Sequence, residues 1–350
     1  MKKKNKVIIF ILLSVAIVIF IVTLFVAIKD KSKKKVKYGN AISYITELYD
    51  ADAESNNLKK DNTIDANIRY HGENPNNYVS FNNELWRIIG VFGNNIKLIR
   101  NESLGVLSWD SSDSSVNNGY GVNEWSQADL KEYLNTMYYG ETTVTCYNGA
   151  NNKTTTCPSA SLNENAKSMI DNHTWATGAV KRTGVAQDPY MEKLYTIPVY
   201  DEERGMYTGT CITKDIYCND TVTRTTKWTG YVALPYLTDY VYSSSEDLCS
   251  NYMKGKYDVW THNANDLICY KNNWMYANNQ DEDGEWVLSA VGSTFQGGSK
   301  SSVWHIVVDG GMFHWGAANP LFARPSVYLK SDVKITSGTG TSSDPYILEI

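Results

Sequence analysis

An uninterrupted apolar segment, residues 7–28, is the feature that most constrains this chain, because it contains no charged residue and lysines flank it on both sides. As a helix it is about 33 Å long, enough to cross a hydrocarbon core of about 30 Å. It therefore predicts a transmembrane helix after a cytoplasmic tail, residues 1–6. The alternative is a cleavable signal peptide, but its apolar region spans about 7 to 15 residues and ends in a small-x-small site, which this segment lacks.

The cysteines predict the compartment of the downstream chain. Six cysteines fall into three locally spaced pairs, and pairing in order is the simplest of fifteen possible connectivities. Disulfides persist outside the reducing cytosol. We therefore expect a single-pass protein of the cell membrane whose C-terminal domain is extracellular. The alternative is six free thiols buried in the core. The expected pairs are Cys146 with Cys157, Cys211 with Cys218, and Cys249 with Cys269.

The net charge of the chain restricts the classes of partner that it can bind. Residues 1–37 hold ten Lys and one Asp, so removing their +9 from the whole-chain charge of −5 leaves −14 on the remainder. Binding to nucleic acid needs a basic face, so we expect no nucleic-acid partner. The ten Trp and 25 Tyr residues are typical of β-rich surfaces that stack on flat ligands and hydrogen-bond polar ones. The membrane, and a carbohydrate or a surface protein, are the partners that this composition favours.

The hydrophobic pattern divides the rest of the chain in two. Residues 29–66 predict a basic stalk and a short helix over 40–49, and residues 67–350 predict one extracellular domain. Alternating segments at 78–81, 84–92 and 96–100, separated by Asn- and Gly-containing turns, predict antiparallel strands. Helical stripes occur at 126–137 and 162–171. The expected fold class is therefore α+β, a mainly antiparallel β domain with inserted short helices.

Several segments resemble a known group of proteins. They are YVSFNNELWRIIGVF, SSDSSVNNGYGVNEWSQADLKEYLN, CNDTVTRTTKWTGYVALPYLTDY and ARPSVYLKSDVKITSGTGTSSDPYIL. They are similar to an uncharacterised cell-surface family of low-GC Gram-positive bacteria, over about residues 60–350. Residues 286–289, 309–311 and 324–329 are also similar to the C-type-lectin-like fold of formylglycine-generating enzymes. That resemblance implies a ligand surface on the C-terminal loops, but it implies no activity.

An acidic loop is a candidate Ca²⁺ site. It offers hard oxygen ligands around Gly284, which permits a sharp turn, although the EF-hand spacing is absent. The alternative is a solvated turn. The candidate ligands are Asp281, Asp283 and Glu285.

The predicted hairpin around Asp309-Gly310 carries the ligand-binding candidates. A two-residue turn there places His305 opposite His314 and Trp304 opposite Trp315, and a shift of the turn by one residue breaks that pairing. Aromatic side chains on this hairpin could form a stacking platform for a sugar or a partner chain. The alternative is aromatic filler on a half-exposed hairpin. The ligand-binding candidates are Trp304, His305, Phe313, His314, Trp315 and Phe322.

The sequence thus predicts a membrane-anchored extracellular ligand-binding protein, lectin-like or adhesin-like. No nucleophile, Walker or metalloprotease motif occurs, so no catalytic residue is proposed and an enzyme is the less favoured class. Two alternatives stay open. One is a pilin-like structural subunit, which lacks its processing site here, and the other is a cell-surface enzyme related to formylglycine-generating enzymes.

Overall fold

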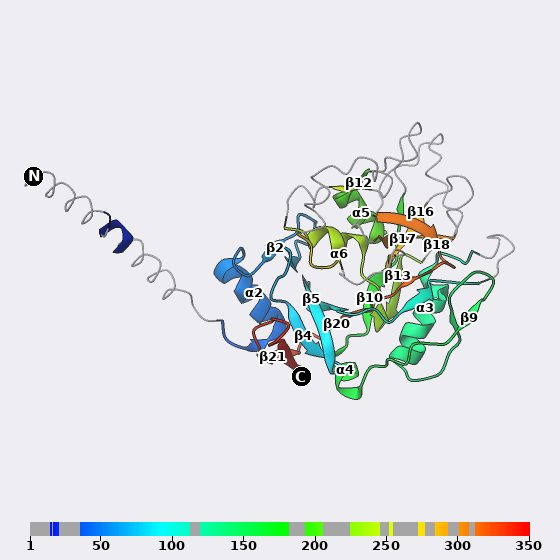
Figure 1. Ribbon diagram of the computed structural model, residues 1–350, viewed down its shortest axis with the longest axis horizontal. Helices are drawn as coiled ribbons and strands as arrows, with labels where there is room; N and C mark the ends of the chain where they lie inside the picture. Colours follow the sequence, from blue (N-terminus) through cyan, green and yellow to red (C-terminus); the bar gives the residue numbers. More distant parts are fainter. Residues whose placement is uncertain are drawn as a thin grey trace, which may run out of the picture. The chain divides into compact units, whose positions relative to one another are not determined.

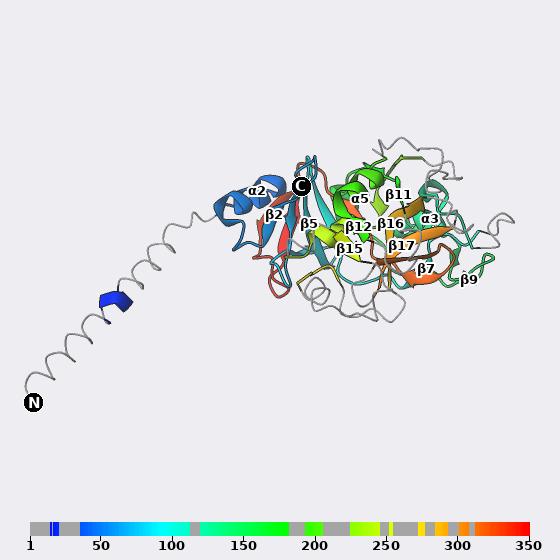
Figure 2. The same cartoon turned by 90° about the horizontal axis from the view of Figure 1, so that it is seen from above.

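The chain forms two compact units, Met1–Lys37 and Tyr38–Ile350. The computed structural model describes residues 15, 17–20, 36–112, 120–181, 193–205, 225–245, 252–254, 272–276, 284–292, 301–307 and 312–350. Within the second unit, α2 (Ala41–Asp52) lies at one end, and α3 (Asp129–Glu132) with β9 (Thr154–Thr155) lies at the other (Figures 1 and 2).

The expected membrane anchor is corrected by the structure. Most of the apolar segment 7–28 lies outside the described residues. Within this segment the structure describes Val15 and residues 17–20, and these are helical. Among the residues that the structure describes, no helix has both the length and the hydropathy to cross a bilayer. On this finding the transmembrane helix is not supported, and neither is the prediction of a single-pass protein of the cell membrane with an extracellular C-terminal domain.

The larger sheet contains the strands that the alternating pattern predicts. Among the described residues it has ten strands and mixed pairing, because β22 runs parallel to β4 and the other pairs are antiparallel. In spatial order its main path is β1 (Gly39–Asn40), β21 (Lys334–Ser337), β22 (Tyr346–Glu349), β4 (Tyr78–Phe81), β5 (Glu84–Phe92), β6 (Asn95–Arg100), β20 (Ser326–Tyr328) and β14 (Val232–Ala233), with β3 (Ile68–Tyr70) on β5 and β2 (Leu58–Lys60) on β3.

Turn chemistry fixes the centre of this sheet. Asn82 and Asn83 join β4 to β5 with φ of 60° and 61°, a left-handed conformation that asparagine tolerates better than most residues. Gly93, at φ 56°, begins the turn from β5 to β6. The three strands predicted at 78–81, 84–92 and 96–100 are therefore confirmed, with β6 beginning one residue early.

The second sheet carries the aromatic hairpin. Six strands belong to it in the described part of the chain, and β16 pairs in parallel with both β19 and β11. Its order is β18 (Met312–Gly316), β17 (Ser302–Ile306), β16 (Glu285–Gly292), β19 (Pro320–Phe322) and β7 (Val106–Ser108), with β11 (Ala179–Lys181) on β16. The described residues also contain three two-stranded ribbons: β10 (His173–Ala176) with β13 (Lys227–Gly230), β12 (Lys193–Tyr195) with β15 (Tyr252–Lys254), and β8 (Cys146–Tyr147) with β9.

The helices are few and short, which corrects the α+β prediction. In the described residues of the second unit the longest is α2, which Asn40 caps by accepting a hydrogen bond from Ser43 N. The stripe at 126–137 becomes a 3₁₀ turn, a single α turn and a π segment, so it does not form one regular helix. The fold is mostly sheet with mixed pairing. The other helical segments are η1 (Trp125–Gln127), η2 (Tyr133–Tyr138), α4 (Glu164–Met169), α5 (Thr196–Glu203) and α6 (Leu237–Tyr242).

A buried ion-pair network joins the larger sheet to α6. Arg69 Nε lies 2.6 Å from Asp61 Oδ2, and Arg69 Nη1 lies 2.8 Å from Asp239 Oδ1. Lys97 Nζ lies 2.5 Å from the second oxygen of Asp239. Burial lowers the pKa of Lys97 to about 8, although Asp239 favours its charged form. Removing one partner from such a network leaves an uncompensated buried charge, so these residues hold α6 against the sheet.

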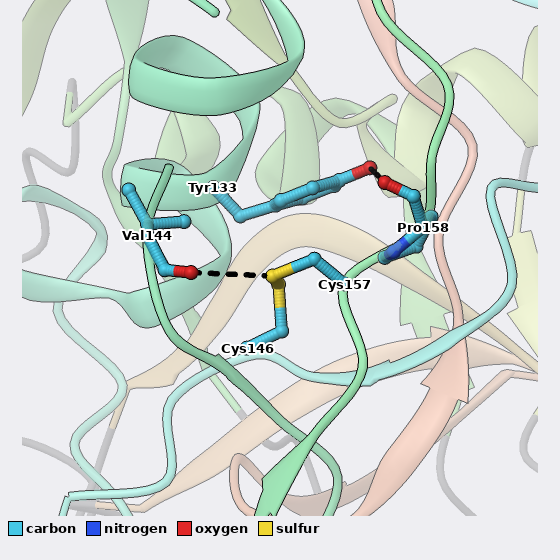
Figure 3. Close-up of a disulfide and its surroundings, with 5 residues drawn as sticks. All are labelled: Tyr133, Val144, Cys146, Cys157 and Pro158. Atoms are coloured by element: carbon cyan, nitrogen blue, oxygen red, sulfur yellow. Dashed lines mark hydrogen bonds between the residues drawn. A yellow bond between two sulfur atoms is a disulfide. The ribbon is translucent and has the colours of Figure 1, made fainter. Parts of the chain in front are cut away.

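One of the three expected disulfides lies within the described residues. Cys146 and Cys157 are bonded, with their Cα atoms 5.2 Å apart, and they close the β8–β9 ribbon (Figure 3). The ribbon is held against η2, because the Tyr133 hydroxyl donates to the carbonyl of Pro158 at 3.4 Å. Four cysteines lie outside the described residues, namely Cys211, Cys218, Cys249 and Cys269.

Candidate functional site

The aromatic hairpin forms, but its register differs from the predicted one. The cross-strand partners are Trp304 with His314, His305 with Phe313, and Val303 with Trp315. The expected pairings of His305 with His314 and of Trp304 with Trp315 are therefore wrong. The physical reason is the length of the connection between the two strands. Ile306 lies opposite Met312, so an odd number of residues, 307–311, separates this pair, whereas a two-residue turn always places an even number of residues between cross-strand partners.

This register separates the aromatic candidates onto two faces. Trp304 is buried and its Nε1 donates to the carbonyl of Val180 at 3.1 Å, while half-buried His314 lies beside it. His305 is also buried, on the opposite face, where its ring contacts Phe313 and Trp315 with centroids 5.7 and 6.2 Å away. Of these five hairpin candidates, only Trp315 is exposed, with 42% of its surface accessible. Trp315 is therefore the candidate that a ligand can reach directly.

The remaining candidates lie elsewhere. Phe322 is half-buried on β19, two strands away from β17, opposite Val106. Glu285 is fully buried, with Arg324 Nε 2.8 Å from its Oε2 and the Tyr240 hydroxyl bound to its Oε1. Its carboxylate thus belongs to a buried ion pair, a role that the sequence did not predict. Asp281 and Asp283 lie outside the described residues, and the described residues hold no cluster of three or more candidate metal ligands.

The surroundings of Trp315 include a second exposed ring. Tyr120 is 51% exposed, and its ring lies against Gly316, where an added Cβ would meet Tyr120 Cδ1 at 3.5 Å. Ala318 N donates to the carbonyl of Tyr120 at 3.1 Å. The segment around Tyr120 is therefore bonded to the end of β18, and the Tyr120 ring lies on the face of that strand opposite to the Trp315 side chain, because successive side chains of a strand point to opposite faces. We call this region the loop–hairpin junction and define it as residues 108–112, 120–129 and 315–319.

Backbone hydrogen bonds fix the loop to the hairpin. The carbonyl of Ala317 accepts from Trp109 N at 2.8 Å and from Asp110 N at 3.1 Å. The Ser108 hydroxyl donates to the carbonyl of Ala318 at 2.8 Å. On its far side, Ser111 accepts through its carbonyl from Asn152 N at 3.0 Å, at the tip of the disulfide-closed ribbon. These contacts hold the junction from both sides.

Two carboxylates lie next to each other in the junction. Asp110 Oδ1 accepts from Ser112 N, from the Ser112 hydroxyl and from Val122 N, at 3.1, 2.6 and 2.8 Å. Asp129 Oδ2 accepts from Ser111 N at 2.8 Å. Burial and, to a lesser extent, the charge of Asp110 raise the pKa of Asp129 to about 6, although the Ser111 bond opposes the shift. The carboxyl group of Asp129 therefore holds its proton more tightly than a free aspartate does.

Three tryptophans in contact with one another lie close to these carboxylates in the chain. The rings of Trp109 and Trp125 lie 5.2 Å apart, and Trp228 meets Trp125 edge to face at 5.9 Å. Trp109 and Trp125 are buried and Trp228 is half-buried. Glu124, next in sequence to Trp125, accepts from the Thr225 hydroxyl at 2.7 Å. The sequence gave no signal that Trp109 would meet Trp125, because the contact depends on packing between separate segments of the chain.

Comparison of the chain with protein-family models, with curated proteins and with solved structures finds no match. The resemblance carried by the sequence motifs stays an expectation.

Proposed function

We propose that this protein is a ligand-binding protein that takes a neutral, polar ligand of the carbohydrate class at the loop–hairpin junction. The observation that carries the proposal is the exposed ring of Trp315 at the end of β18, with the exposed ring of Tyr120 on the other face of the same strand beside Gly316. Exposed aromatic rings beside fixed polar groups are the usual way in which proteins bind sugars by stacking and hydrogen bonding.

Side chains that donate hydrogen bonds and side chains that accept them lie in the same junction as the rings. Asn319 is half-buried and is held by its Nδ2, which donates to the carbonyl of Gly316 at 3.0 Å. Ser112 is half-buried in the adjacent loop, where its hydroxyl donates to the buried carboxylate of Asp110. The Asn319 amide and the Ser112 hydroxyl oxygen can exchange hydrogen bonds with a ligand that has several hydroxyl groups.

Charge favours a neutral ligand. Residues 38–350 carry a net charge of −14, and the junction itself contains Asp110, Glu124 and Asp129. An anionic ligand would be repelled by this field, whereas a neutral glycan is not affected by it. The same charge disfavours nucleic acid.

The test is a glycan and cell-wall-fragment binding screen on the full chain, with and without Ca²⁺, followed by single substitutions. We expect saturable binding that Trp315→Ala and Tyr120→Ala each weaken about five- to thirtyfold, because one stacked ring contributes about 1 to 2 kcal/mol. The matched control is Ile64→Ala, which removes an apolar side chain that is 83% exposed between β2 and β3 of the larger sheet. Absence of glycan binding, or equal loss in the control, would overturn the proposal.

A further inference from the structure

Three buried hydrogen-bond donors in the junction have no partner among the residues that the structure describes. They are Trp109 Nε1, Ser111 Oγ and Trp125 Nε1, and each is enclosed by protein. We call these three groups the donor cluster. An unpaired polar group that is shut away from water costs as much as a lost hydrogen bond, so native proteins leave few of them.

The three members belong to one place in the fold. The rings of Trp109 and Trp125 are neighbours at 5.2 Å, and Ser111 follows Trp109 after one residue. Asp129, bonded to Ser111 N, begins the helix α3 that follows Trp125, and Leu130 N donates to the carbonyl of Trp109 at 3.1 Å. Three unpaired donors within one local cluster indicate a shared partner that the protein itself does not supply.

The chemistry of the cluster restricts that partner. Indole nitrogens donate and cannot accept, so they do not ligate a cation. An anion is disfavoured because the carboxylates of Asp110, Glu124 and Asp129 lie in the same segment. A neutral oxygen atom remains, because it accepts from N–H groups and, as a hydroxyl or water, also donates to a carboxylate.

We propose that the donor cluster is a binding site for a neutral oxygen, supplied by an enclosed water molecule or by a hydroxyl group of the ligand that the junction takes. The second source rests on the proposed function, and the first does not. Trp228 makes the second source feasible, since it is half-buried and contacts Trp125, so the cluster is one ring away from the surface. The bound oxygen then satisfies donors that would otherwise destabilise the fold.

Ser111→Ala tests the site with little change of volume. If an oxygen is bound, the substitution removes one of its hydrogen bonds, and the melting temperature of the full chain should fall by about 2 °C. The matched control is Ser326→Ala in β20, whose hydroxyl is also buried and unpaired but has no second unpaired donor beside it in sequence. Ser326→Ala should leave the melting temperature unchanged or raise it.

A second pair of variants tests the indole groups. Trp125→Phe removes an unpaired N–H, and Trp286→Phe removes an N–H that donates to the carbonyl of Leu107 at 3.0 Å. If the cluster holds an oxygen, the two variants should lose stability to a similar extent. The site does not exist if two results are found together. Ser111→Ala and Trp125→Phe are both as stable as the unaltered chain, and ligand binding stabilises both variants as much as it stabilises the unaltered chain.

Melting with and without chitotetraose separates the two sources of the oxygen. A loss of stability in the free protein assigns an enclosed water molecule. If instead Ser111→Ala leaves the free protein as stable as the unaltered chain but reduces the stabilisation by chitotetraose, the oxygen is assigned to a ligand hydroxyl. If no glycan stabilises the unaltered chain while Ser111→Ala still lowers its melting temperature, the proposed function fails and the oxygen site stands.

Discussion

Replacing Cys146 and Cys157 together by serine should destabilise the second unit by about 3 kcal/mol. The disulfide closes a loop with a sequence separation of 11. In the chain-entropy model, that loop restricts the unfolded chain by about 9 cal/mol/K, which is about 2.8 kcal/mol at 25 °C. An unfolding entropy of about 2.1 cal/mol/K per residue over residues 38–350 converts this to a fall of about 4 °C in melting temperature.

The assay is thermal unfolding followed by circular dichroism, for the double serine variant and the unaltered chain without reductant. The double substitution is preferable to adding a reductant, because it changes only the bond between Cys146 and Cys157. Thr154→Ser, on the exposed face of the same ribbon, is the control for a change in β8–β9 that leaves the bond intact. A shift below about 1 °C would refute the reasoning, because the bond would then close no loop that is open in the unfolded chain.

Three further predictions concern buried charge and the site. Arg324→Met should cost about 3 to 5 kcal/mol in chemical denaturation because it leaves the fully buried Glu285 without its ion-pair partner, whereas removing both charges together as Arg324→Met/Glu285→Gln should recover part of that loss. The pKa of Asp129 is raised to about 6, so the folded protein holds this proton more tightly than the unfolded chain, and stability should fall as pH rises from 4 to about 6. Asp129→Asn should flatten that part of the pH profile, and an unchanged profile would contradict the assignment. Lys97→Met should leave the buried carboxylate of Asp239 with Arg69 as its remaining partner in this network, so that its charge is less well compensated. The substitution should therefore lower the denaturation midpoint more than Lys330→Met, which changes an exposed residue.

Local patterns predicted the parts of the fold that local interactions control. The strands β4, β5 and β6 follow from alternation and from Asn and Gly turns whose positive φ the structure contains. The apolar spacing predicted a short helix over 40–49, and the structure contains α2 over Ala41–Asp52, where Asn40 is the cap. These elements needed no knowledge of distant contacts.

Distant contacts decided what the sequence could not predict. The register of β17 and β18 depends on the length of their connection, and a difference of one residue moved Trp304 to a buried face and left Trp315 exposed. Glu285 was predicted as a candidate Ca²⁺ ligand with a solvated turn as the alternative, but Arg324, far along the chain, pairs with it inside the core. The approach of Trp109 to Trp125 has no local signature at all. The helical stripe at 126–137 was overridden by packing, which broke it into short irregular turns.

The central claim is that a neutral glycan binds at the loop–hairpin junction, and indole NMR tests it most directly. The ten tryptophans each give one indole N–H signal, which can be assigned by single Trp→Phe variants. On titration with chitotetraose and soluble cell-wall fragments, we expect the Trp315 signal to shift saturably while the signal of Trp86, fully buried in the larger sheet, stays in place. A titration that shifts other tryptophans and leaves Trp315 unmoved, or that shifts none, would contradict the account.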